Sequence, residues 1–303
     1  MSELLSLPNE IIGVICEYLS DKDFHSTKFT CGRIYSILLS NRFIQNASLK
    51  TQHICYSVLQ KRENIFITGV GGTGKSYTLT KICQLAPKYN LRVAITAPTG
   101  RASCLFENGR TIHSFSGLKL GKIKIPQIME DFKKTKRVPG KQNWNAIDIL
   151  IIDEVSMLGA SFFEKLDVCA RLAKQINEPF GGLQLVFSGD FLQLQPVGDK
   201  FCFLSPIWNR LKFKTYEMTV PVRQNEDIIY FNLLNRIRTA THTEADIRLL
   251  QSRMIEYDEE FLIKPTKIYS KNIDVEKINQ EEFKKVNNPI EFTIHAQDSV
   301  DGR

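Results

Sequence analysis

The sequence has no apolar run that approaches the roughly 20 residues a membrane-spanning helix needs. Its N-terminus, MSELLSLPNEII, lacks the basic segment and the small-residue cleavage site of a secretory signal. The seven cysteines are odd in number and form no C-x-x-C pair. A disulfide framework and a zinc site are therefore not expected, and the sequence predicts an intracellular protein that is not secreted and has no membrane partner.

The composition that is present suits a globular chain with room for two domains, with 43% hydrophobic and 24% charged residues in 303. The net charge of +7 is uneven, because residues 1–50 are balanced while residues 119–141 carry eight basic and two acidic side chains. Such a segment can attract nucleic-acid phosphates or can be an ordinary solvated loop. Charge alone leaves both readings open.

Short apolar strands alternate with helical patterns along most of the chain. Residues 7–45 read as a small helical unit, and the expected later elements are a helix at 49–61, a strand at 65–68, a helix at 75–86, a strand at 91–96, an irregular basic region at 98–145, and strands at 147–153 and 183–189. All-apolar strands separated by helices predict an α/β fold whose parallel sheet is covered by helices on both faces.

A phosphate site is predicted after the first of these strands. The stretch GVGGTGKS fits the pattern G-x-x-x-x-G-K-[ST], and its candidate nucleotide-binding residues are Gly69, Gly71, Gly72, Thr73, Gly74, Lys75 and Ser76. Glycines let backbone N–H groups converge on phosphate oxygens, and the helix that follows directs its positive end at the anion. Lys75 can reach the β- and γ-phosphates of ATP, and Ser76 can ligate Mg²⁺.

Two further strand ends narrow the chemistry. In ILIIDEVSM, Asp153 is placed to hold Mg²⁺ and Glu154 to orient and deprotonate the attacking water. In FSGDFLQLQPV, Gln193 follows Asp190 and can contact a γ-phosphate or its water. A small-molecule kinase does not need the adjacent Asp-Glu pair, so this combination favours hydrolysis.

Taken together, these motifs resemble the superfamily 1 DNA helicases of the 5′-to-3′, RecD-like branch, and within them the petite-integration-frequency group. The resemblance covers about residues 49–279 and rests on LKTQ, GVGGTGKS, TAPTGRAS, TIHSFSG, WNAIDILIIDEVSML, GDFLQLQPV and VPVRQNEDIIYFNLLNRIR. It implies that Gln52 contacts adenine and that Arg223 reaches the γ-phosphate, which adds Arg223 to the catalytic candidates Lys75, Asp153, Glu154 and Gln193.

The resemblance also implies single-stranded DNA as a partner, held by Thr99, Gly100, His113 and Ser114. Thr99 and Gly100 end a predicted strand, where backbone amides and a hydroxyl can hold phosphates. His113 can donate to a phosphate or stack on a base, although a lone histidine is often structural.

The sequence departs from this family in two places. Pro221 stands where the family has a bulkier residue before Val222 and Arg223, and it could alter the loop that aims the arginine. The family's second RecA-like lobe should contain two further motifs, but the chain ends at HAQDSVDGR soon after PTKIYSKNIDVEKIN, which resembles that lobe's opening strand and helix. We expect either a fragment of a longer or split gene, which the intact catalytic residues favour, or a degenerate protein that keeps ATP or DNA binding only.

The first residues resemble an F-box, in LPNEIIGVICEYLSDKDFHSTKFTCGRIYSIL. The resemblance implies docking of residues 7–45 onto the adaptor of a cullin-type ubiquitin ligase. A helical extension packed on the motor domain is the alternative. The predicted domains are an F-box-like unit at 1–47, a RecA-like P-loop helicase domain at 48–215 and the start of an incomplete second lobe at 216–303.

The sequence therefore predicts an ATP-dependent DNA helicase, truncated here, that hydrolyses ATP on single-stranded DNA in repair, recombination or genome maintenance. The alternative is an F-box recruiting module whose helicase remnant binds ATP or DNA without unwinding. An F-box fused to a helicase favours a nucleus or a viral replication site in a eukaryotic cell. A P-loop kinase is the third reading, and the Asp153-Glu154 pair argues against it.

Overall fold

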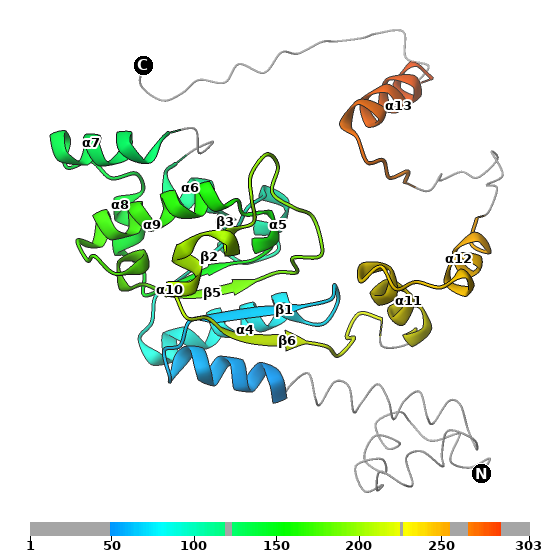
Figure 1. Ribbon diagram of the computed structural model, residues 1–303, viewed down its shortest axis with the longest axis horizontal. Coiled ribbons are helices and arrows are strands. Elements are labelled where there is room, and N and C mark those ends of the chain that lie inside the picture. The colour runs from blue at the N-terminus through cyan, green and yellow to red at the C-terminus, as the bar shows by residue number, and fades with distance from the viewer. Residues whose placement is uncertain (1–48, 119–122, 225–226, 255–265, 286–303) are drawn as a thin grey trace, which may run out of the picture. The chain divides into compact units, whose positions relative to one another are not determined.

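The computed structural model describes residues 49–118, 123–224, 227–254 and 266–285 (Figure 1). The helical unit predicted at residues 7–45, with its F-box resemblance, lies outside the described residues. The chain divides into two compact units, Met1–Asp246 and Ile247–Arg303. The predicted domain boundaries after residues 47 and 215 stay predictions.

The first unit is built on a six-stranded sheet in which all neighbouring strands are parallel. In chain order its strands are β1 (Ile65–Gly69), β2 (Val93–Ala97), β3 (Arg110–Thr111), β4 (Ile149–Ile152), β5 (Gln184–Ser188) and β6 (Lys214–Met218). Their order in space is β3-β2-β4-β5-β1-β6. The predicted parallel sheet is confirmed, and the four predicted strands are β1, β2, β4 and β5, whereas β3 and β6 were not expected.

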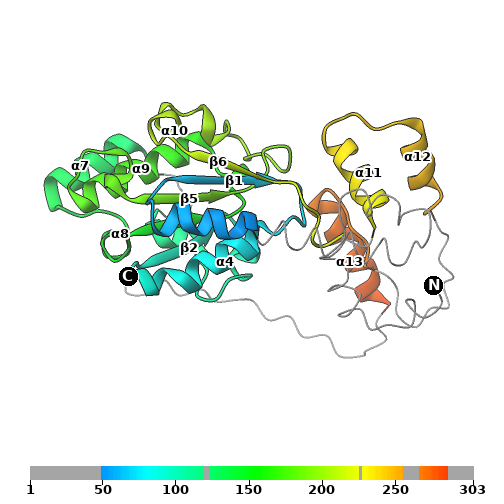
Figure 2. The ribbon, with the colours of Figure 1, turned by 90° about the horizontal axis from the view of Figure 1, so that it is seen from below.

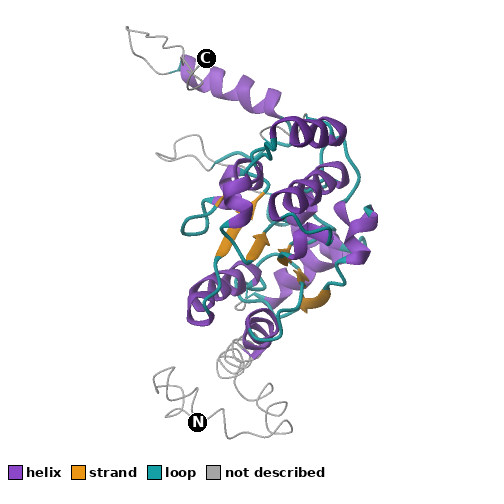
Figure 3. Cartoon of the chain, turned by 90° about the vertical axis from the view of Figure 1, so that its left-hand side faces the viewer, coloured by secondary structure: helices purple, strands orange, loops and turns teal. Residues whose placement is uncertain are grey.

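Helices cover both faces of this sheet, as Figures 1, 2 and 3 show. A helix runs through residues 49–59. The others are α4 (Lys75–Leu85), α5 (Gly100–Ser103), α6 (Ile112–Ser116), α7 (Ile125–Thr135), α8 (Lys141–Asn145), α9 (Ala160–Lys174), α10 (Pro206–Arg210), α11 (Ile228–Arg238), α12 (Glu244–Gln251) and α13 (Asn272–Lys284), with short 3-10 helices at Ala86–Tyr89, Val155–Met157, Pro179–Gly182 and Cys202–Leu204. Within the described part of the chain, no helix combines the length and apolar character that a bilayer crossing requires.

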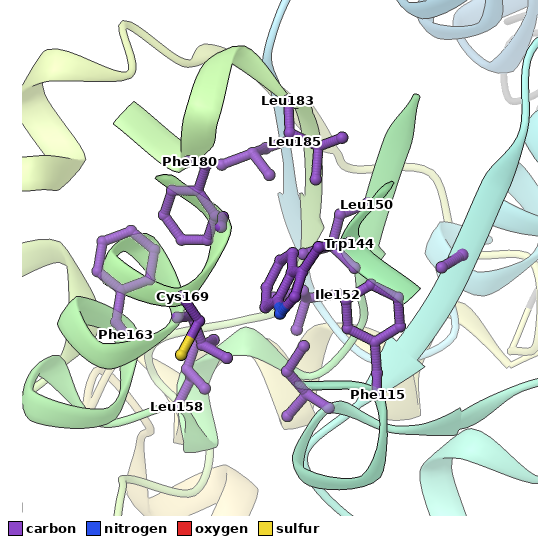
Figure 4. Close-up of a cluster of buried hydrophobic side chains, with 14 of the residues drawn as sticks. Phe115, Trp144, Leu150, Ile152, Leu158, Phe163, Cys169, Phe180, Leu183 and Leu185 are labelled. Carbon is purple, nitrogen blue, oxygen red and sulfur yellow. The ribbon is translucent and has the colours of Figure 1, made fainter. Parts of the chain in front are cut away.

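The strands alternate their side chains between two apolar cores, because successive residues of a strand point to opposite faces. In β4, Ile149 and Ile151 join the core under α4 and the helix at 49–59, while Leu150 and Ile152 join the other. Figure 4 shows this second core, where α6, α8 and α9 add Phe115, Trp144, Phe163 and neighbouring side chains. Burial on both faces explains why these strands read as continuous apolar runs.

The prediction of an irregular region at residues 98–145 was wrong. It contains α5, β3, α6, α7 and α8. Threonine side chains cap α5 and α6, since Thr99 accepts from Ala102 N–H and Thr111 from Ser114 N–H. In α7 the apolar residues Ile125, Ile128 and Phe132 fall on one helical face, but the surrounding lysines obscured that spacing.

Strand β6 closes one edge of the sheet and lies close against the end of β1. A Cβ placed on Gly69, whose φ is +136°, would lie 2.2 Å from the carbonyl oxygen of Met218. No side chain fits there, so the first glycine of the phosphate motif has a packing role as well as a conformational one. Exposed Lys214 and Glu217 on β6 suit an edge strand, where charge discourages further pairing.

In the second unit, α13 matches the helix expected from the family resemblance. The opening strand expected before it is not found among residues 266–271, which have no regular structure. A strand needs a second strand beside it with which to form hydrogen bonds, and none of the residues described after Asp246 belongs to a strand.

Candidate nucleotide and DNA site

Most of the candidate residues lie at or just past the carboxyl ends of parallel strands. The phosphate loop follows β1, Asp153 and Glu154 follow β4, and Gln193 follows β5. The predicted DNA residues follow β2 and β3, which pair with Ala97 opposite Thr111. Because these ends meet at one edge of the sheet, the structure brings the two sets together on adjacent strands, where open α/β sheets bind ligands.

The phosphate loop is held by its own lysine. Lys75 Nζ donates to the carbonyl oxygens of Gly69 at 2.7 Å and of Val70 at 3.0 Å. Gly74 at φ +88° turns the chain into α4, so the helix begins at Lys75 with free N–H groups facing the loop. Burial lowers the pKa of Lys75, while the carboxylates of Glu154, Asp190 and Asp153 act in the opposite direction. The cation therefore lies among three anions at the place where phosphates are expected.

Ser76 and Asp153 are hydrogen-bonded, although 77 positions separate them in the chain. Ser76 Oγ donates to Asp153 Oδ2 at 3.1 Å. Asp153 is buried and is fixed by its N–H, which donates to Thr96 O at 2.9 Å. A hydroxyl and a carboxylate side by side, next to a lysine, are oxygen ligands that suit Mg²⁺ carried by a nucleotide.

Glu154 adopts a left-handed backbone conformation, with φ 51° and ψ 42°. That conformation costs a non-glycine residue about 1 kcal/mol or more, and such strain is often found at functional positions. Burial, Asp153 and Asp190 raise the pKa of Glu154, which Lys75 partly offsets. A carboxylate with a raised pKa is a stronger base, as its predicted role requires.

Asp190 is buried and forms the centre of a hydrogen-bond network that sequence reasoning only partly anticipated. Its carboxylate accepts from Leu192 N–H at 3.1 Å and from Gln193 Nε2 at 3.3 Å. It also forms a bidentate ion pair with Arg238 at the end of α11, at 2.6 and 2.8 Å. Sequence reasoning missed Arg238, because 48 positions separate the pair and no local motif connects them.

Residues 221–224 pack on the phosphate loop. The N–H groups of Val222 and Arg223 both donate to Gly72 O, at 2.9 and 3.0 Å. A Cβ on Gly72 would lie 2.6 Å from Gln224 Oε1 and 2.9 Å from Arg223 Cβ. The backbone of Arg223 is therefore anchored beside the loop while its side chain is exposed, and its contact with the γ-phosphate stays a prediction.

Gln52 is exposed on the helix at 49–59. Its neighbour Thr51 shares a 2.9 Å hydrogen bond with Thr78 of α4, which sets this helix against the one that begins at the phosphate loop. The position is compatible with the adenine contact that the family resemblance implies, and that role stays a prediction.

The four DNA candidates differ in how free they are. Gly100 and Ser114 are exposed, and the space around Gly100 is open. Thr99 Oγ1 is engaged in capping α5, where it accepts from Ala102 N–H at 3.2 Å. The ring of His113 stacks on Phe162 of α9 with centroids 4.3 Å apart, and burial lowers its pKa. One face of His113 is thus occupied, and the DNA contacts stay predictions.

A parallel sheet, a phosphate loop between strand and helix, and an Asp-Glu pair at a neighbouring strand end together define the P-loop NTPase fold. The family described as PIF1-like helicase matches residues 45–244, and the chain belongs to this family. An F-box domain profile matches residues 4–46.

Relatives and solved structures agree with this assignment. The ATP-dependent DNA helicase PIF1 of Emericella nidulans is 34% identical over 261 residues, which is 83% of this chain and 34% of that protein. The crystal structure of Pif1 helicase from Candida albicans has a TM-score of 0.69 at 32% identity and covers 79% of this chain and 55% of that one. Pif1 helicase from Bacteroides in complex with ADP-AlF3 and ssDNA has a TM-score of 0.64 at 28% identity, over 79% and 57%.

These structural matches confirm the predicted RecA-like fold. The chain spans about a third of the length of the curated relative, 34%.

Proposed function

We propose that this chain carries the ATP-binding lobe of a DNA helicase, which hydrolyses ATP on single-stranded DNA and moves in the 5′-to-3′ direction of the family it resembles. The observation that carries the proposal is the arrangement at the carboxyl edge of the sheet. Lys75 and the hydrogen-bonded pair Ser76–Asp153 lie after β1 and β4, and the DNA candidates follow the adjoining β2 and β3. Repair, recombination or genome maintenance is the corresponding cellular role, in a nucleus or a viral replication site.

The residues of the loop fit a Mg²⁺-bound ATP. Lys75 would exchange its contacts with Gly69 O and Val70 O for phosphate oxygens, and Ser76 and Asp153 would hold the cation, which offsets the negative charge of the phosphates. Glu154 would take the proton of the attacking water, and Gln193 would orient that water or the terminal phosphate. Arg223 would add positive charge where negative charge develops.

Binding to DNA gives the experiment that tests this proposal. Gly100→Asp adds a carboxylate where nothing lies within 4 Å, at a helix N-terminus that tolerates an acidic residue. We expect the variant to fold normally and to bind an oligothymidylate about tenfold more weakly at low salt, with a smaller difference at high salt. Fluorescence anisotropy at several salt concentrations measures this effect, and phosphate release with and without the oligonucleotide measures stimulation of hydrolysis.

Asn177→Asp is the matched control, because it adds the same charge in the segment that precedes β5, at the opposite edge of the sheet. Its binding should equal that of the wild type. If Gly100→Asp binds the oligonucleotide as tightly as the wild type does, the DNA does not bind at the end of β2. A wild-type chain that neither binds single-stranded DNA at low salt nor responds to it with faster hydrolysis would contradict the helicase assignment.

The F-box match supports a second function for the N-terminal residues. We propose that residues 7–45 dock onto the adaptor of a cullin-type ubiquitin ligase, so that the helicase part would bring the ligase to DNA-bound targets. If the helicase part binds ATP or DNA but does not hydrolyse ATP, the chain would act only as the F-box recruiting module described above as the alternative. We expect the purified adaptor to retain the wild-type chain and to retain several-fold less of the double variant Leu7→Ala, Pro8→Ala, because these replacements remove apolar contact area. Equal recovery of the two proteins in the pull-down would rule this docking out.

A further inference from the structure

Arg238 joins helix α11 to the nucleotide site. It is the last residue of α11, and its Nε and Nη2 donate to the two oxygens of Asp190 at 2.6 and 2.8 Å. Such two-pronged contacts between a guanidinium and a carboxylate are strong and fix direction as well as distance. Asp190 is buried and Arg238 is largely so, which removes most of the screening by water.

The same carboxylate holds Gln193. Asp190 Oδ2 accepts from Gln193 Nε2 at 3.3 Å, and the backbone N–H of Gln193 donates to Asp190 O at 2.9 Å. A carboxylate only accepts hydrogen bonds, so the amide nitrogen of Gln193 faces Asp190 and its amide oxygen is left for another partner. A Cβ on Gly71 would lie 3.9 Å from that nitrogen, which places the amide beside the phosphate loop.

The chain around α11 is therefore held at the nucleotide site at two points, one ahead of the helix and one at its last residue. Before the helix, Val222 and Arg223 donate to Gly72 O. At its last residue, Arg238 reaches Asp190 and, through it, Gln193. The next helix, α12, crosses the division between the two compact units at Asp246. Arg238 therefore lies in the part of the chain that leads into the second unit.

Charge gives the pair a second consequence. Lys75 lies in the field of Glu154, Asp190 and Asp153, and Arg238 opposes that field. Burial alone would raise the pKa of Asp190, but hydrogen bonds from Arg238 and Leu192 hold it below its usual value, so the carboxylate stays ionised. Without Arg238, an uncompensated anion would face the terminal phosphate of a bound nucleotide.

We propose that Arg238 is a positioning residue for recognition of the terminal phosphate, which holds Asp190 so that Gln193 faces the phosphate loop and which cancels a carboxylate charge that would repel ATP. This inference rests on the proposed function, because it assumes that the loop binds ATP. The residue acts through Asp190 and Gln193 and does not itself touch the nucleotide.

The test compares a non-hydrolysable ATP analogue with ADP, since only the former carries the γ-phosphate. Isothermal titration calorimetry gives both dissociation constants for the wild type, Arg238→Met, Arg238→Lys and the double variant Asp190→Asn, Arg238→Met. We expect Arg238→Met to bind the ATP analogue about tenfold more weakly and ADP nearly as the wild type does. The double variant should recover part of the loss because it carries no unpaired charge, and Arg238→Lys should lie between Arg238→Met and the wild type.

A pH series separates this role from a purely structural one. In Arg238→Met the buried Asp190 loses its partner, so its pKa should rise above the usual value. The charged groups that act on the pair are Lys75 and Glu154, with Glu217 near Arg238. Affinity of Arg238→Met for the ATP analogue should increase as the pH is lowered toward this raised pKa, because Asp190 takes up a proton and loses its charge. The double variant has no carboxyl at position 190 and should lack this increase relative to the wild type.

Thermal unfolding of each variant shows how much stability the ion pair contributes. If Arg238→Met is less stable but keeps the wild-type preference for the ATP analogue over ADP, and the wild-type pH profile, then Arg238 only fastens α11 and the proposal is overturned. If the wild type binds neither nucleotide, the proposed function itself fails. A loss of binding that is seen only in the variants would leave the proposed function intact.

Discussion

Lys75→Ala is expected to abolish measurable binding of Mg²⁺-ATP, with a loss of affinity of about 100-fold or more. The lysine is partly buried and lies in the field of Asp153 and Glu154, so without its charge these two carboxylates face the triphosphate uncompensated. Truncating one partner of a buried, hydrogen-bonded charge pair costs about 2–5 kcal/mol, which converts to an effect of this size. Fluorescence anisotropy with a labelled ATP analogue measures the affinity.

Lys81→Ala is the control for this variant. It removes the same side chain from the same helix further on, where Lys81 donates to Gln84 and lies over the ring of Tyr77. It should bind nucleotide as the wild type does. Equal affinities of the Lys75→Ala and wild-type proteins, with both folded by circular dichroism, would show that the loop is not the nucleotide site.

Glu154→Gln is expected to leave nucleotide binding intact and to reduce hydrolysis by about 100-fold or more. Glutamine keeps the shape of the side chain but cannot accept a proton, and general base catalysis contributes about 10²- to 10⁴-fold. The neighbouring Asp153 keeps its hydrogen bond to Ser76, so the expected metal ligands are unchanged. Phosphate release in the presence of single-stranded DNA, together with the binding assay, separates the two effects.

The matched control is Glu178→Gln, which alters an exposed glutamate in the segment before β5, away from the site. Wild-type rates of phosphate release in Glu154→Gln would exclude this residue as the base. If Glu154→Gln loses nucleotide binding as well as hydrolysis, Glu154 instead supports the structure of the phosphate loop. Its left-handed backbone conformation is consistent with such a role.

The sheet and its nucleotide residues could be predicted because their signals are local. A buried parallel strand such as β4 is apolar at every position, and the phosphate motif stands directly between a strand and a helix. Strand β6 was not predicted, because its position at the edge of the sheet leaves Lys214 and Glu217 exposed and its sequence therefore resembles a polar segment. Strand β3 has only two residues, too few for any period to be detected.

The helices between residues 100 and 135 were not predicted from the sequence for a related reason. Helices α5 and α6 are a single turn each and depend on capping by Thr99 and Thr111, and α7 has a narrow apolar stripe among lysines. Helices this short gain little from intrinsic propensity, so capping and packing against the rest of the protein decide whether they form.

By itself, the sequence determined the class of chemistry. A phosphate loop and an Asp-Glu pair, and the order along the chain of the strands that precede them, are all encoded by residues close together in the sequence. The tertiary structure alone decided which distant residues meet, such as Arg238 with Asp190 and His113 with Phe162. Parallel strands bring their carboxyl ends to one edge whatever the chain length between them, and α11 returns to that edge through contacts that no local pattern records.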